Sequence, residues 1–103
     1  MIAFEIHING QKVVTAGGSD LLSLNAAVSA YGKLGEDTKN AAEPFGNIMV
    51  LGVSMVAENQ SKSSHWCEGL SFSVGDEIRI RFIDVSKADQ PERIENTAFE
   101  NEN

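Results

Sequence analysis

The chain has 103 residues, of which 42% are hydrophobic and 22% are charged, a composition typical of a single globular domain. Its formal net charge is -7 and its pI about 4.6, which argues against nucleic acid or an anionic membrane as a partner, because both bind basic surfaces. A basic protein partner is compatible with this charge.

The protein is expected in the cytoplasm. Cys67 is the only cysteine, so no intramolecular disulfide can form, and the N-terminal segment lacks the basic and apolar regions of a secretion signal. The longest apolar run, 48–56, contains Gly52 and Ser54 and is too short to span a bilayer. We therefore expect a protein without a membrane partner.

The beginning of the chain has the pattern of a β-hairpin. Large apolar residues alternate with others from 2 to 8, as in a strand with one apolar face. Asn9-Gly10 follows and suits a two-residue turn, which needs positive φ at both positions. With a second strand at 11–16, this turn predicts that Ile6 pairs with Val13.

The segment after Gly17-Gly18 has the spacing of an amphipathic helix. Ser19 is a suitable N-cap, and Asp20 suits the positive end of the helix dipole. Apolar residues then recur at i, i+3, i+7 and i+10, the spacing of one helical stripe. The members of this stripe are Leu21, Leu24, Val28 and Tyr31. The pattern predicts a helix that ends at Gly32 or Gly35.

Two later segments are predicted to be strands or to contain them. Residues 47–57 are apolar in both registers, which is typical of a central strand covered on both faces. The unit Leu70–Val85 has two alternating runs around Gly75-Asp76, and it predicts a hairpin or a sharp corner in a sheet. The polar segments 36–44 and 58–69 are predicted to be loops.

The chain beyond residue 88 is predicted to be an acidic, flexible tail, because it buries too little to offset its ordering entropy. The domain is therefore expected at 1–88 and the tail at 89–103. The elements follow the order strand, strand, helix, strand, strand. The predicted fold is α+β, with a mostly antiparallel four- to five-stranded sheet and one helix packed on it. A sheet curled toward a small barrel is the alternative.

The residues do not assemble a catalytic, cofactor or metal site. His65-Trp66-Cys67-Glu68 is the one cluster with potential ligands, but zinc needs three or four of them and no second cysteine is present. A nucleophilic Cys67 would need hydrogen-bond contact with a histidine and a third, orienting group. A loop in which Trp66 packs is the simpler interpretation, so no metal or cofactor is predicted and enzyme activity is not favoured.

Other polar motifs have structural explanations. Gly17-Gly18-Ser19-Asp20 lacks the spacing of a phosphate-binding loop and is explained by a strand end followed by a helix cap. Asp76 is expected to accept a hydrogen bond from the local backbone. Arg79 and Arg81 share one face of a strand and are expected to pair with a neighbouring carboxylate or to bind an acidic group.

Several short pieces resemble a scattered set of short, uncharacterised bacterial proteins of the gene-cassette type. The pieces are Ile8-Asn9-Gly10, Thr15-Ala16-Gly17, Trp66, Leu70, Val74-Gly75-Asp76-Glu77-Ile78 and Pro91-x-Arg93. The resemblance covers most of residues 6–93. It implies a binding or immunity-type role and brings no catalytic residues.

Two classes of function remain. The first is a non-enzymatic protein-interaction module, of an immunity or defence type, with an acidic surface. The second is a small-molecule-binding protein or minor enzyme with a pocket between helix and sheet. A homodimer through the second apolar face of the sheet is also expected. The candidate interaction or pocket residues are Tyr31, Met49, Met55, His65, Trp66, Arg79 and Arg81.

Overall fold

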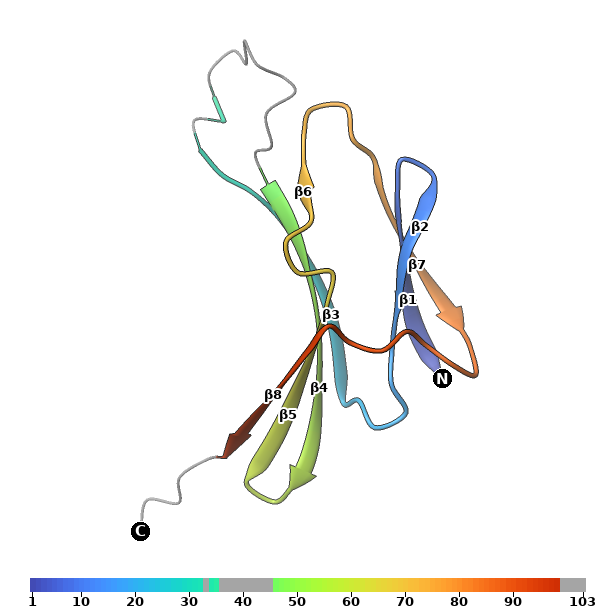
Figure 1. The fold of residues 1–103 in the computed structure, drawn as a ribbon, viewed down its shortest axis with the longest axis vertical. Coiled ribbons are helices and arrows are strands. Elements are labelled where there is room, and N and C mark those ends of the chain that lie inside the picture. The colour runs from blue at the N-terminus through green and yellow to red at the C-terminus, as the bar shows by residue number, and fades with distance from the viewer. Residues whose placement is uncertain (33, 36–45, 99–103) are drawn as a thin grey trace.

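The computed structural model describes residues 1–32, 34–35 and 46–98, and these residues form two antiparallel sheets (Figure 1). The three-stranded sheet has the order β2-β1-β7 and the five-stranded sheet the order β3-β4-β5-β8, with β6 paired to β4. The strands are β1 (Ile2–Ile8), β2 (Gln11–Ala16), β3 (Ser23–Ala30), β4 (Gly46–Ala57), β5 (Gln60–Trp66), β6 (Ser71–Phe72), β7 (Ile78–Asp84) and β8 (Arg93–Ala98).

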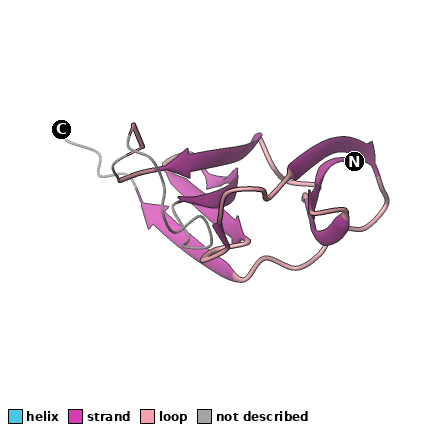
Figure 2. Ribbon diagram, turned by 90° about the horizontal axis from the view of Figure 1, so that it is seen from above, coloured by secondary structure: helices cyan, strands magenta, loops and turns pink. Residues whose placement is uncertain are grey.

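The predicted α+β class is wrong, because the described residues contain strands and loops but no helix (Figure 2). The predicted barrel is not formed either. Each sheet keeps two edges within the described chain, namely β2 and β7 in one and β3 and β8 in the other. The predicted loop at 36–44 lies outside the described residues.

The predicted β1–β2 hairpin is confirmed, with one change of register. Asn9 and Gly10 have φ values of 51° and 81°, and Ile8 pairs with Gln11 across the two-residue turn. A bulge after Ile6 then shifts the pairing by one residue, so that Ile6 pairs with Val14 and not with Val13.

The predicted helix is the main error, because this segment forms strand β3. The predicted helical stripe contains Leu24 and Val28, but in a strand these two residues lie on the same face as Ala26, because every second residue points to the same side. All eight residues of β3 pair with β4 in an unbroken register. Hydrogen bonding to β4 therefore prevails over a helical spacing that the local sequence only weakly supports.

The predicted loop at 58–69 is also wrong, because most of it forms β5. This strand pairs with β4, from Val50–Trp66 to Ala57–Gln60, and with β8 on its other side. Its serine-rich sequence has little β-propensity, and its place between two strands determines its structure.

The predicted strand at 47–57 is confirmed as β4, which lies at the centre of the larger sheet. Ile48 and Val50 are buried on the face toward the other sheet, whereas Met49 and Met55 on the opposite face are each 45% exposed. Only one of its two apolar faces is therefore covered by the described chain. The buried apolar core consists of Ile6, Ala16, Ile48, Val50, Trp66, Cys67 and Phe72.

The unit Leu70–Val85 forms a corner and not a hairpin, since β6 pairs with β4 while β7 pairs with β1. Asp76 stabilises this corner: one carboxylate oxygen accepts a hydrogen bond from the Ser73 N–H at 2.8 Å and the other from Asn9 Nδ2 at 3.1 Å. These bonds lower the pKa of Asp76, with the Ser73 backbone bond as the main cause. The expected backbone bond of Asp76 is thus confirmed.

The chain beyond residue 88 contains structure that the sequence did not suggest. Asp89 lies beside β2: its Oδ2 accepts from the Thr15 N–H at 2.8 Å, and its own N–H donates to the Thr15 carbonyl at 2.9 Å. The Trp66 indole N–H donates to the Asp89 carbonyl at 2.9 Å. The segment predicted to be a flexible tail thus contains two structured parts: a linker that is hydrogen-bonded to both sheets, and strand β8. Residues 99–103 lie outside the described chain.

Candidate functional site: an open sheet edge and its groove

Among the described residues, four strands form the edges of the two sheets, and three of these strands carry protective features. β2 has Lys12 and a bulge, β7 has Arg79 and Arg81, and β8 has Arg93 and Glu95. Charges, bulges and covering loops are the usual means by which proteins prevent an edge strand from pairing with another chain. Asp89 adds a covering segment to β2 through its two bonds to Thr15.

Strand β3 has none of these features, and we call it the open edge. Its sequence SLNAAVSA contains no charge and no proline, and its pairing with β4 has no bulge. Within the described chain it pairs only with β4, and no other described strand occupies its second side. Val28, near its middle, is 55% exposed.

An apolar groove of about 450 Å³ lies between the two sheets and adjoins the open edge. Three of its side chains are largely exposed: Ile2 at 70%, Leu22 at 73% and Phe82 at 75%. Leu24 of the open edge lines the same groove, so the edge and the groove form one continuous surface. The large side chains of the groove are Met1, Ile2, Phe4, Leu21, Leu22, Leu24 and Phe82. Exposed apolar surface of this kind marks interaction sites in soluble proteins.

The groove is held in shape by close packing on both of its sides. The Phe4 and Phe82 rings meet edge to face, with 5.1 Å between their centroids. Leu21 fills the space above Gly52, where an added Cβ would come within 2.8 Å of the leucine side chain and 3.1 Å of Trp66. A side chain at position 52 would therefore displace Leu21. The contact between Leu21 and Gly52 thus holds in place the loop that leads into β3.

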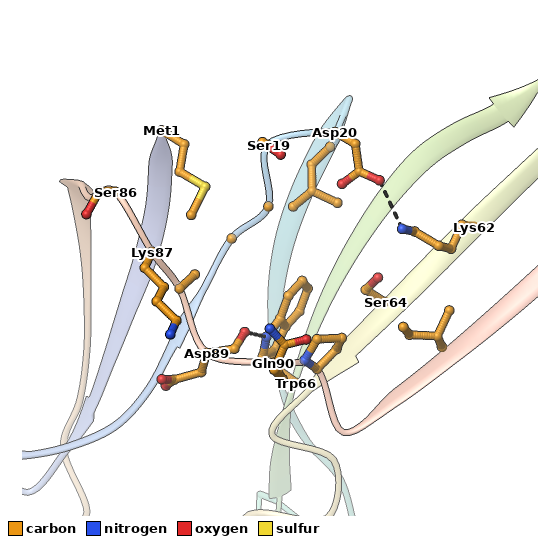
Figure 3. Close-up of a pocket in the computed structure, with 16 residues that line it drawn as sticks. Met1, Ser19, Asp20, Lys62, Ser64, Trp66, Ser86, Lys87, Asp89 and Gln90 are labelled. Atoms are coloured by element: carbon orange, nitrogen blue, oxygen red, sulfur yellow. Dashed lines mark hydrogen bonds and ion pairs between the residues drawn. The ribbon is translucent and has the colours of Figure 1, made fainter.

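A second, more polar cavity of about 330 Å³ lies between β5 and the linker that follows β7. Figure 3 shows Lys87 and Gln90 reaching into it from the linker, opposite Ser64. Lys62 donates to Asp20 at 2.9 Å, and this bond lowers the pKa of Asp20. The Lys87 ammonium and the Gln90 amide form no hydrogen bond with a described residue.

The predicted candidate residues do not meet in one place. Trp66 lines the polar cavity, whereas Met49 and Met55 lie on the opposite face of the five-stranded sheet. Tyr31 follows β3 and is 58% exposed. The expected pocket between helix and sheet is not formed, because no helix exists in the described residues.

The two arginines of β7 lie on the outer face of the three-stranded sheet. Arg81 Nη1 is 3.4 Å from Glu5 Oε1, which confirms the expected pairing with a carboxylate of a neighbouring strand. The same carboxylate oxygen contacts His7 Nε2 at 2.6 Å, and this bond is the main cause of a lowered pKa of Glu5. Arg79 pairs in register with His7 and belongs to the same outer face.

His65 is buried, but its neighbours are carboxylates and not a nucleophile. Its Nδ1 is 3.2 Å from Glu68 Oε1 and its Nε2 is 3.9 Å from Glu95 Oε2. Arg93 pairs with both Glu68 and Glu95, and it lowers the pKa of Glu68. Burial raises the pKa of the Cys67 thiol to about 11, so this thiol is protonated at neutral pH and poorly suited to nucleophilic attack.

Among the described residues, the carboxylates that pair with Lys62, Arg81 and Arg93 lie in separate parts of the molecule. Glu58 lies in the turn between β4 and β5, whereas Glu77 directly precedes β7 in the other sheet. Figure 1 shows the turn between β4 and β5 well apart from β7.

The sequence did not point to the open edge or to the groove. Leu22 and Val28 lie in the segment predicted to be a helix, and Phe82 lies in the unit Leu70–Val85. Their exposure becomes visible only when the sheets are assembled. The alternation of Leu24, Ala26, Val28 and Ala30 was the one signal that could have identified β3.

Comparison with known proteins gives no match: no family model, no curated protein and no solved structure resembles the chain significantly. Within the described residues, no group of three or more His, Cys, Asp or Glu side chains could hold a metal ion. No helix in the same residues is long and apolar enough to span a membrane.

Proposed function

We propose that the protein is a non-enzymatic interaction module that binds a protein partner by adding a strand to the open edge β3. The observation that carries this proposal is the contrast between β3 and the other three edges. An edge of eight residues without charge, proline or bulge favours pairing with another chain.

The groove explains how such a module would select its partner. In strand addition, main-chain hydrogen bonds supply affinity, and pockets for alternate side chains supply specificity. A strand added to β3 would direct alternate side chains toward the groove of Leu22, Leu24 and Phe82. The partner is therefore expected to contain an extended segment with apolar residues at every second position.

A photo-reactive amino acid at position 28 tests this proposal in cells that produce the protein. Position 56 is a matched control, because Val28 and Val56 are both valines and are 55% and 58% exposed. Covalent protein adducts are expected several-fold more often at position 28, and a charge in the open edge, Ala27→Lys, should abolish them. Equal or absent adducts at position 28 would contradict strand addition.

A second function, the binding of a small ligand, is favoured by the polar cavity. Lys87 and Gln90, which form no hydrogen bond with a described residue, line it beside Trp66, an arrangement suited to a small anion. Calorimetric titration with benzoate as the probe tests this function. Binding that is lost in Lys87→Met would support it, and heats that are unchanged in this variant would count against it.

A further inference from the structure

We infer that the strand added to β3 is β3 of a second copy of this chain, so that two five-stranded sheets form one continuous sheet. This inference rests on the proposed function and names its partner.

Two-fold symmetry restricts the register. Two identical antiparallel strands in one sheet are related by an axis perpendicular to that sheet, so each residue lies opposite one on the same face. A strand centred on Ala26 then places Ala26 opposite itself, Leu24 opposite Val28 of the second copy, and Ser23 opposite Ser29. These three pairs join apolar to apolar or hydroxyl to hydroxyl, and the neutral Asn25 lies opposite Ala27.

Strand β7 is poorly suited to such self-pairing in its central registers. A two-fold arrangement of β7 centred on Arg81 would bring two arginines directly opposite each other. Centred on Ile80 it would place Arg79 opposite Arg81, again with like charges. Like charges opposite each other destabilise a strand pair, whereas β3 carries no charge at all.

The groove supplies the surface that a strand pair alone lacks. A stable interface buries about 1,200 Å² or more, which exceeds what one pair of short strands with small side chains covers. Since the axis is perpendicular to the sheet, both grooves lie on the same side of it and adjoin the same edge. Pairing would therefore bring the largely exposed Ile2, Leu22 and Phe82 of each copy toward the interface.

Disulfide trapping tests this register. Cysteines at Ala26 would lie about 4.5–5.5 Å apart between Cα atoms, within the range of a disulfide. Cysteines at Ala27 would be offset diagonally by about 7–8 Å, at or beyond that range. The native Cys67 is buried with its pKa raised to about 11, so the unmodified chain serves as the blank.

Mild oxidation of Ala26→Cys is expected to give a covalent dimer of twice 11.1 kDa, at a yield at least several-fold above Ala27→Cys. Val28→Lys in the Ala26→Cys chain should reduce this yield, and Val53→Lys on the outer face should not. Loss of the dimer only with Val53→Lys would overturn the inference in favour of packing between outer faces. Preferential trapping at Ala27 would overturn the register.

The outcome also separates this inference from the proposed function. If the photo-reactive group at position 28 captures a different protein and Ala26→Cys yields no dimer, strand addition stands and self-pairing fails. If neither experiment gives an adduct, both fail. Sedimentation of the unmodified chain at high micromolar concentration provides an independent measure, because a mass that stays at 11.1 kDa contradicts self-pairing.

Discussion

Strands β2 and β3 are both sheet edges, but β2 is protected against pairing with another chain and β3 is not. β2 has a lysine, a bulge and a linker that binds both backbone groups of Thr15, whereas β3 is smooth, uncharged and uncovered by the described chain. Protection at one edge shows that this chain has the means to cover an edge. Its absence at β3 is therefore informative, and it points to a partner that provides the missing cover.

The largest effect is expected from Trp66→Ala, which removes the anchor of the linker that covers β2. Trp66 is 2% exposed and its indole N–H donates to Asp89, so truncation should cost about 3–5 kcal/mol of unfolding free energy. Urea denaturation measures this change. Val74→Ala, at a residue that is 56% exposed, is the control and should cost no more than about 0.5 kcal/mol. Similar costs for both variants would show that Trp66 is not a core anchor.

A smaller effect is expected from Asp89→Ala, which would convert β2 from a covered edge into an open one. Thr15 is 7% exposed, and its N–H would lose its partner at a cost of about 1–3 kcal/mol. Amide exchange at Thr15 should become faster. Asp89→Asn keeps an oxygen acceptor and should preserve most of the protection. Unchanged exchange in Asp89→Ala would mean that the linker does not cover β2.

The smallest effect is expected from Asp76→Asn. Asp76 accepts a hydrogen bond from Asn9, which lies in the turn between β1 and β2. The pKa of Asp76 is lowered from 3.8, so its ionised form is favoured by folding. The resulting stabilisation is present above the ordinary pKa and is lost as the pH falls through the lowered one. The urea midpoint should therefore decrease more steeply between about pH 5 and pH 3 in the native chain than in Asp76→Asn. Glu77→Gln is the neighbouring control and should follow the native curve, while parallel native and Asp76→Asn curves would contradict a role for this carboxylate.

Local sequence signals predicted a definite part of the fold. The Asn9-Gly10 turn, the long strand β4, the alternating strand β7 and the backbone bond of Asp76 were all identified, because each depends on residues close together in the chain. The bulge in β2 was not predicted, and it moved the partner of Ile6 by one residue. Such a shift is set by the sheet as a whole and has no marker in the hairpin sequence.

The candidate site belongs to the part that only the tertiary structure decided. The spacing of Leu21, Leu24 and Val28 fits a helix as well as a strand, and pairing with β4 selects the strand. The exposure of Phe82 likewise depends on its place in an edge strand rather than on its alternating sequence. An edge is a relation between strands that are distant in the chain. The sequence by itself therefore determined turns and apolar periods, and the pairing of remote strands determined which edge stays open.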